Sequence, residues 1–126
     1  MKGIHHISLK ARGEENFEEV LDFYGRVLGC GVVRTWGTGA ERGAMLNLGN
    51  VLLEVTANGA ADLKKGHFAH IAFAVDDVDA AAERVRRAGC EIFIEPVDKR
   101  LGGEYPIRIA FCTGPAGEEL EFFLER

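Results

Sequence analysis

Apolar side chains recur at helical spacing in two stretches of the chain. The first stripe has the spacing i, i+3, i+4, i+7 and i+11, and Gly29 supplies the stop that such a helix needs. The second stripe is shorter, and Asp76 or Asp77 can cap it. We therefore predict two helices, with apolar faces made of Phe17, Val20, Leu21, Tyr24 and Leu28 in the first and Val78, Ala81, Ala82 and Val85 in the second.

Eight short segments rich in β-branched and aromatic residues surround these helices and predict strands. Gly49-Asn50 is a two-residue hairpin signal between the third and the fourth. The order βαβββ occurs twice, which indicates the α+β class, with mostly antiparallel strands and helices on one side of the sheet. The predicted strands are Ile4–Lys10, Val32–Trp36, Ala44–Leu48, Val51–Thr56, Phe68–Val75, Glu91–Glu95, Ile107–Cys112 and Leu120–Leu124.

The two halves also repeat their chemistry. His6 and His70 each lie in the first predicted strand of one half. Glu54 and Glu121 each lie among apolar residues near the end of the same half. The separations from histidine to glutamate are similar, at 48 and 51 residues. An unpaired carboxylate buried in such an apolar run costs several kcal/mol, so we expect a cationic group to face Glu121.

The length of 126 residues is that of one ordinary domain. Halves of about 60 residues fold poorly alone, so we expect modules of about 1–58 and 67–126 to pair into a single domain, 1–126. The joint between them is predicted near Ala57–Gly66, which contains turn-forming residues.

Composition excludes several classes of protein. The net charge of −5 argues against a protein that binds nucleic-acid phosphates, which requires clustered Lys and Arg. Three widely spaced cysteines indicate neither a disulfide framework nor a zinc knuckle, and they favour a reducing compartment. The sequence shows no signal peptide and no apolar run of about 20 residues, so we predict a cytoplasmic protein without a membrane partner.

Strand alternation assigns the candidate residues to faces. His6 shares a face with Ser8 and Lys10 and is expected to point into a polar or open space. His5 falls on the opposite face, where packing is the simpler role. Glu54 lies opposite the apolar side chains that precede and follow it in its strand.

Two imidazoles and two carboxylates form a ligand set of nitrogen and oxygen donors. Such a set suits Ni(II), Zn(II), Co(II) or Fe(II) and leaves coordination positions open for a substrate. A single strand histidine is more often a core or surface residue, and a single strand glutamate usually faces water. The recurrence of the same order in both halves favours metal ligation by His6, Glu54, His70 and Glu121.

The ordered set of motifs resembles the vicinal oxygen chelate superfamily, also called the glyoxalase/bleomycin resistance/dioxygenase group, over essentially the whole chain. The resemblance implies paired βαβββ modules that curl into a mixed sheet around a metal-containing cup. It is carried by His6, Leu21–Gly29, Glu54, His70–Val75 and Gly117–Glu121.

Within this superfamily the chain is most similar to bacterial glyoxalase I, the lactoylglutathione lyase. That branch uses two His and two Glu, and all four positions match. It also holds the glutathione carboxylate with an Arg four residues after the first histidine and an Asn four residues after the first glutamate. Asn58 matches, whereas Lys10 replaces the Arg and offers a point charge in place of a bidentate fork.

The resemblance implies a metal-dependent lyase or isomerase that converts a 2-oxoaldehyde–thiol hemithioacetal into a 2-hydroxyacyl thioester through a metal-bound enediolate. Glu121 would be the catalytic base, and Glu54 would be a ligand or partner base. One divalent ion per site is implied, with Ni, Zn or Co favoured over Fe or Mn. The partners expected are a small-molecule substrate, such as a thiol conjugate, and a second copy of the chain in a homodimer.

Two other readings of this site stay open. One is another metal-dependent enzyme of the superfamily, an epimerase or a dioxygenase, and the other is a non-catalytic small-molecule-binding protein. Trp36 either lines the substrate cup or fills the core. We predict that Lys99–Gly103 forms a basic loop, which is either solvated or a lid over an anionic substrate. His67 is predicted to be a packing or surface residue.

Overall fold

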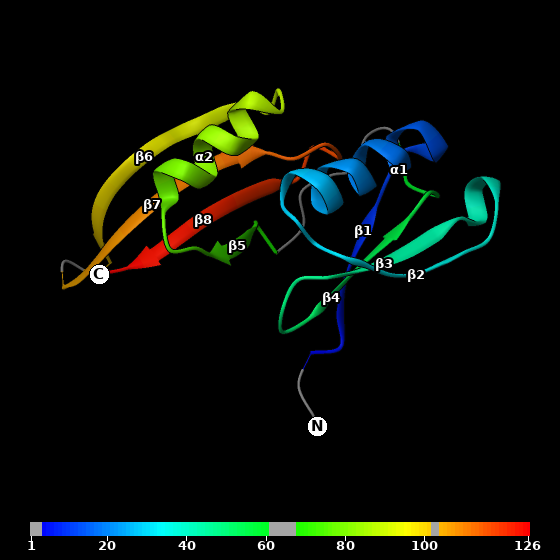
Figure 1. The fold of residues 1–126 in the computed structure, drawn as a ribbon, viewed down its shortest axis with the longest axis horizontal. Helices are drawn as coiled ribbons and strands as arrows, with labels where there is room; N and C mark the ends of the chain where they lie inside the picture. Colours follow the sequence, from blue (N-terminus) through cyan, green and yellow to red (C-terminus); the bar gives the residue numbers. More distant parts are fainter. Residues whose placement is uncertain (1–3, 61–67, 102–103) are drawn as a thin grey trace. The chain divides into compact units, whose positions relative to one another are not determined.

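The computed structural model describes residues 4–60, 68–101 and 104–126. It divides the chain into two compact units, Met1–Lys64 (unit 1) and Lys65–Arg126 (unit 2). Each unit contains a helix lying over a four-stranded sheet (Figure 1). His67 and part of the predicted joint lie outside the described residues.

Unit 1 has one mixed sheet with the strand order β1-β4-β3-β2. The first and last strands of the unit pair in parallel, and the other neighbours are antiparallel. Its elements are β1 (His6–Lys10), α1 (Gly13–Asp22), a π-helix (Phe23–Val27), β2 (Val32–Trp36), a 3-10 helix (Gly39–Glu41), β3 (Gly43–Asn47) and β4 (Leu52–Thr56).

Unit 2 repeats this topology in the order β5-β8-β7-β6, again with its first and last strands parallel. Its elements are β5 (Ile71–Ala74), α2 (Val78–Arg87), β6 (Ile92–Leu101), β7 (Tyr105–Thr113) and β8 (Glu119–Glu125). The predicted α+β class and the doubled βαβββ order are confirmed, as two four-stranded mixed sheets.

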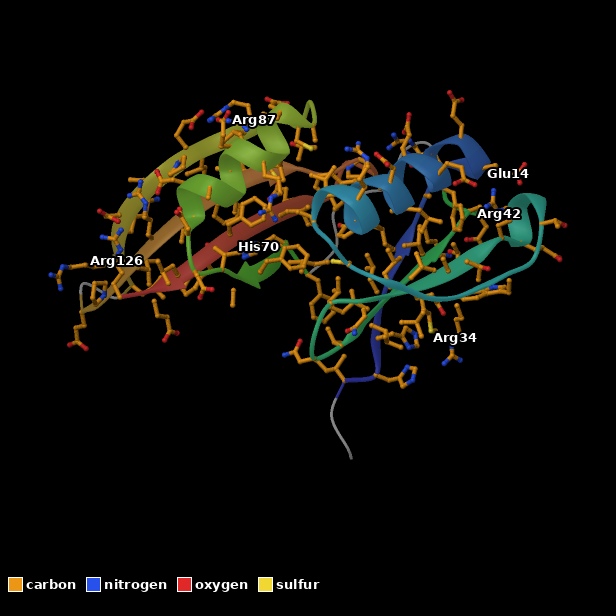
Figure 2. The ribbon with its side chains drawn as sticks, in the orientation of Figure 1. Glu14, Arg34, Arg42, His70, Arg87 and Arg126 are labelled. Carbon is orange, nitrogen blue, oxygen red and sulfur yellow. The ribbon has the colours of Figure 1, made fainter. Side chains whose placement is uncertain are left out.

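The core of unit 1 lies between α1 and one face of its sheet. Phe17, Val20 and Tyr24 are buried, as are Leu53 and Val55 of β4. The guanidinium of Arg42 lies 4.7 Å from the centre of the Phe17 ring and pairs with Glu18 at 2.6 Å and Glu14 at 3.8 Å. Figure 2 shows Arg42 and Glu14 at the helix side of unit 1.

The core of unit 2 is built in the same way. Val78, Ala82 and Val85 of α2 are buried, together with Leu120 and Phe122 of β8. The Asp77 side chain accepts a hydrogen bond from the Ala80 amide at 2.9 Å, so the predicted cap of this helix is confirmed.

An ion pair fastens α2 to its sheet. Arg108 of β7 donates from Nε and Nη2 to the Asp79 carboxylate at 2.6 and 2.7 Å, and from Nη1 to Asp98 at 3.1 Å. The Arg108 bonds hold the pKa of the Asp79 carboxyl below its usual range. A bidentate guanidinium–carboxylate pair is geometrically specific, so it fixes the position of the helix on the sheet.

The first helix departs from its predicted apolar face in its last turn. After Asp22 the backbone continues as a π-helix, in which Phe23 and Val27 are buried; Leu28, the residue that follows it, is only half-buried. A π-helix bonds each amide to the carbonyl five residues earlier, so its residues turn through a different angle. Gly29 then adopts a φ of 77°, which confirms the predicted stop.

The sixth strand is longer than the sequence predicted. We expected it to end at Glu95, but β6 continues to Leu101. The register passes from Ile94 to Val97 across a bulge, and Pro96 occupies that bulge on the edge strand of the sheet. Proline is tolerated at such positions because no ladder hydrogen bond is lost there.

The basic loop predicted at Lys99–Gly103 is also corrected, because β6 continues through its first three residues. Lys99, Arg100 and Leu101 are strand residues that pair with β7, and Gly102 and Gly103 lie outside the described residues. His5, expected to pack, is exposed. Within the described part of the chain, no helix is long and apolar enough to cross a membrane.

Phe17→Ala is expected to lower the free energy of unfolding by about 3–5 kcal/mol, because Phe17 is 1% exposed and its loss leaves a cavity under Arg42. Glu15→Ala on the exposed side of α1 is the matched control and should stay within about 0.5 kcal/mol of wild type. Urea unfolding followed by circular dichroism measures both. Equal stability of the two variants would contradict the assigned core.

Candidate functional site

The His–Glu pair of unit 1 lies on the sheet face opposite α1. His6 and Ser8 of β1 are exposed, whereas the intervening Ile7 is half-buried. In β4 the alternation is the same, with Glu54 half-buried between two buried residues. His6 Nε2 lies 4.0 Å from Glu54 Oε2.

Two neighbours orient this pair. Ser8 stands opposite Glu54 in the parallel register and donates its hydroxyl hydrogen to Glu54 Oε1 at 3.0 Å. The Nδ1 atoms of His5 and His6 lie 3.0 Å apart, so one ring donates to the other. Sequence alternation placed Ser8 on this face, but only the strand register showed that it contacts the carboxylate.

The corresponding pair of unit 2 is tighter and more buried. His70 precedes β5, and its Nε2 lies 3.0 Å from Glu121 Oε2 (His70 is labelled in Figure 2). Glu121 is only 7% exposed. Phe111 stands opposite Glu121 on β7, and its ring packs edge-on against the His70 ring with centroids 5.1 Å apart. The His70 imidazole therefore faces this buried carboxylate.

The two pairs occupy equivalent places in their units. In unit 1 the residue two positions after the histidine, Ser8, is opposite Glu54. In unit 2 the residue two positions after the histidine, Ala72, is opposite Glu121. His6 in β1 and His70 just before β5 thus each reach the glutamate one step diagonally, on the same face of the sheet.

The donor spacing within each His–Glu pair can be compared with the spacing of ligands around a divalent ion. Zinc-type ions hold nitrogen and oxygen donors at about 2.0–2.2 Å, so two adjacent donors lie about 3.0–3.5 Å apart. The 3.0 Å between the donor atoms of His70 and Glu121 falls in that range, and the 4.0 Å between those of His6 and Glu54 lies slightly beyond it. In the parts of the chain that the structure describes, no three His, Cys, Asp or Glu side chains gather into one cluster. The four-ligand set stays a prediction.

The two predicted substrate-binding residues lie at one end of the unit 1 sheet. Lys10 pairs with Thr56 in the strand register, and the next bridge joins Arg12 to Asn58. Asn58 Oδ1 accepts a hydrogen bond from the Thr56 hydroxyl at 2.9 Å. Lys10 shares the face of His6 and Ser8. The structure therefore brings Lys10 and Asn58 to the same end of the face that carries the His–Glu pair.

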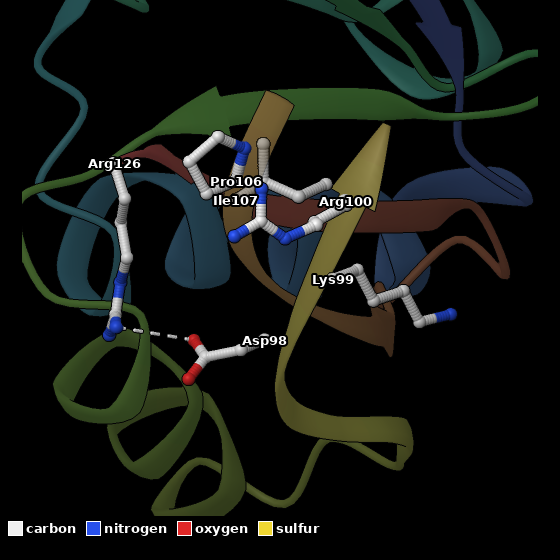
Figure 3. Close-up of a pocket in the computed structure, with 6 residues that line it drawn as sticks. All are labelled: Asp98, Lys99, Arg100, Pro106, Ile107 and Arg126. Carbon is white, nitrogen blue, oxygen red and sulfur yellow. Dashed lines mark ion pairs between the residues drawn. The ribbon is translucent and has the colours of Figure 1, made fainter. Parts of the chain in front are cut away.

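A separate pocket of about 450 Å³ lies at the far end of β6 and β7 in unit 2 (Figure 3). Arg126 pairs there with Asp98 at 3.4 Å. The pocket contains neither the histidine nor the glutamate of unit 2. Its lining residues are Asp98, Lys99, Arg100, Pro106, Ile107 and Arg126.

Fold and side chains together define a protein of two βαβββ units, with one His–Glu pair on the face of each sheet opposite its helix. The Glyoxalase/Bleomycin resistance protein/Dioxygenase superfamily model matches residues 3–122, and the chain belongs to this superfamily. The resemblance drawn from the sequence motifs is confirmed.

Relatives agree with this assignment. A lactoylglutathione lyase from Neisseria meningitidis is 32% identical over 120 residues, which are 88% of this chain and 84% of that protein. A glyoxalase I mutant from Zea mays superposes with a TM-score of 0.76 at 26% identity, covering 95% of this chain and 43% of the other. A glyoxalase family protein from Enterococcus faecalis gives a TM-score of 0.75 at 21% identity, with 98% of each chain covered.

In metal-free protein, His70→Ala is expected to lower the free energy of unfolding by about 1 kcal/mol, because it leaves the buried Glu121 carboxylate without its partner. His5→Ala, at an exposed histidine, should change it by less than about 0.5 kcal/mol. Urea unfolding at neutral pH in the presence of a chelator measures both. A His70→Ala protein as stable as wild type would contradict the stabilising contact.

Proposed function

We propose that this protein is a metal-dependent lyase of the glyoxalase I type, which converts a 2-oxoaldehyde–thiol hemithioacetal into a 2-hydroxyacyl thioester. The observation that carries the proposal is the His–Glu pair repeated at equivalent positions of both sheets. The identity of 32% to a protein named lactoylglutathione lyase supports it.

The proposed metal ligands are His6, Glu54, His70 and Glu121, and the ion could be Ni, Zn or Co. When bound, such an ion supplies Lewis-acid stabilisation of the negative charge that develops on the substrate oxygens. Ser8 keeps the Glu54 carboxylate oriented through its hydrogen bond, and His5 does the same for His6. The homodimer expected from the sequence is part of this proposal.

Glu121 is the proposed base. Its carboxylate would take the proton from the carbon next to the carbonyl and return it to the neighbouring carbon. The setting supports this role because Glu121 is buried beside Phe111 and Phe122, and an apolar site excludes competing water. His70, with Nε2 at 3.0 Å from Oε2, would hold the ion next to this carboxylate as a neighbouring ligand.

Lys10 and Asn58 are the proposed anchors for the anionic end of the thiol. Lys10 is exposed at the end of β1 and can place its ammonium beside a carboxylate. A lysine offers a point charge and makes no bidentate contact, so it does not select glutathione over other acidic thiols.

Metal binding is the most direct test. Chelator-treated protein is expected to take up one divalent ion per chain, measured by elemental analysis after titration with Ni, Zn or Co. Glu54→Gln should weaken this binding at least about tenfold, because an amide is a poorer ligand than a carboxylate. Glu41→Gln, at an exposed carboxylate of the 3-10 helix, is the control and should bind as wild type does. Protein that takes up none of these ions would refute the proposed function.

Glu121→Gln is expected to lower kcat at least about 100-fold, because the amide cannot accept the substrate proton. The assay follows thioester formation from methylglyoxal with glutathione and with smaller acidic thiols, at saturating metal. Glu125→Gln changes an exposed residue on the same face of the same strand and should retain wild-type kcat. Undiminished turnover in Glu121→Gln would reject this carboxylate as the base.

A further inference from the structure

Trp36 occupies an unusual position on the sheet of unit 1. It ends β2 and pairs with Gly43 of β3, and its indole fills the space where a side chain at Gly43 would lie. A Cβ atom added to Gly43 would come within 2.6 Å of indole Nε1 and closer still to the two neighbouring carbons. Because Gly43 has no side chain, the Trp36 indole has room to lie directly against β3.

This indole lies on the face that carries the His–Glu pair. The register across the sheet joins Trp36 to Gly43 and Gly43 to Thr56, two residues beyond Glu54 in β4. Arg34 and Met45 occupy the adjacent row, and Met45 is directly opposite Glu54. Figure 2 shows Arg34 on the side of the sheet away from α1.

Spacing on the sheet brings the indole within reach of a ligand held at Glu54. Neighbouring strands are about 4.8 Å apart, and two residues along a strand span about 6.7 Å, so the backbone positions of Gly43, which lies under the indole, and Glu54 are about 8 Å apart. A single aromatic ring attached beside two vicinal oxygens spans a similar length. Trp36 is 39% exposed, so part of the indole remains open to such a ring.

The residues between the two groups suit an apolar substituent. Gly43 is buried under the indole and adds no side chain that would obstruct a ligand. Met45 is half-buried, and its flexible thioether packs well against aromatic rings. These residues give the open face an apolar strip that leads from Glu54 to the indole.

We propose that Trp36 is a specificity-determining residue, whose indole binds an aromatic substituent of the molecule that has its two oxygens at the His6–Glu54 pair. The inference rests on the proposed function and narrows its substrate class to aryl 2-oxoaldehydes over alkyl ones. Arg34, next to the strip on β2, provides a cation for a substrate that also carries negative charge.

Two hydroxamates test the inference without turnover. Benzohydroxamate and acetohydroxamate present the same pair of vicinal oxygens and differ only in a phenyl or methyl group. Calorimetric titration of the metal-loaded protein gives the ratio of their affinities. Trp36 is the single tryptophan of the chain, so its fluorescence reports directly on contact with the ring.

Wild-type protein is expected to bind benzohydroxamate about tenfold more tightly than acetohydroxamate, with a change in tryptophan fluorescence for the aromatic probe alone. Trp36→Leu should reduce the ratio to less than about threefold, and Trp36→Phe should restore most of it. Gly43→Ala should reduce the ratio as well, because its methyl group displaces the indole. Thr35→Ala, one position away on the opposite face of β2, should leave the ratio unchanged.

The outcomes separate the two proposals. Equal affinities for both hydroxamates in wild type, or a ratio that persists in Trp36→Leu, would overturn the role of Trp36 and leave the proposed function intact. Failure of the metal-loaded protein to bind either hydroxamate, or failure of the protein to take up metal, would overturn both.

Discussion

The parallel pairing of the first and last strands in each unit is the constraint on which the rest of the structure depends. It sets Ser8 opposite Glu54 and Ala72 opposite Glu121, so each histidine lies one diagonal step from its glutamate. A slip of one residue in either strand would turn one member of the pair into the helix-covered core. The register therefore fixes the core and the candidate site together.

Each sheet separates two kinds of surface. The face under the helix buries apolar side chains, such as Leu53 of β4 below α1 and Leu120 of β8 below α2. The other face carries groups that a helix would desolvate at high cost, including His6 and Glu54. Glu121 differs from Glu54 at the corresponding place in its sheet, because it is almost fully buried, with the His70 imidazole as a partner. That contrast gives the two pairs different environments in spite of their equivalent positions.

Much of the fold could be predicted because the elements follow local patterns. Period-2 alternation and the Gly49-Asn50 turn located the strands, and Gly29 ended the first helix where expected. The prediction that the sixth strand ends at Glu95 was wrong, because Pro96 lies in a bulge on an edge strand, where proline interrupts no ladder hydrogen bond. The prediction of the first helix did not include the π-helix Phe23–Val27, because the sequence carries no clear signal for one.

The sequence by itself determined the doubled βαβββ order, the faces of the strands and the four residues proposed as ligands, since each follows from the repeat and from alternation along the chain. Only the tertiary structure decided which side chains meet across strands. Three contacts depend on the register between segments distant in sequence: the Ser8–Glu54 hydrogen bond, the His70–Phe111 ring contact and the position of the Trp36 indole over Gly43. No local pattern encodes that register, because it is set by how the strands bury their apolar faces together.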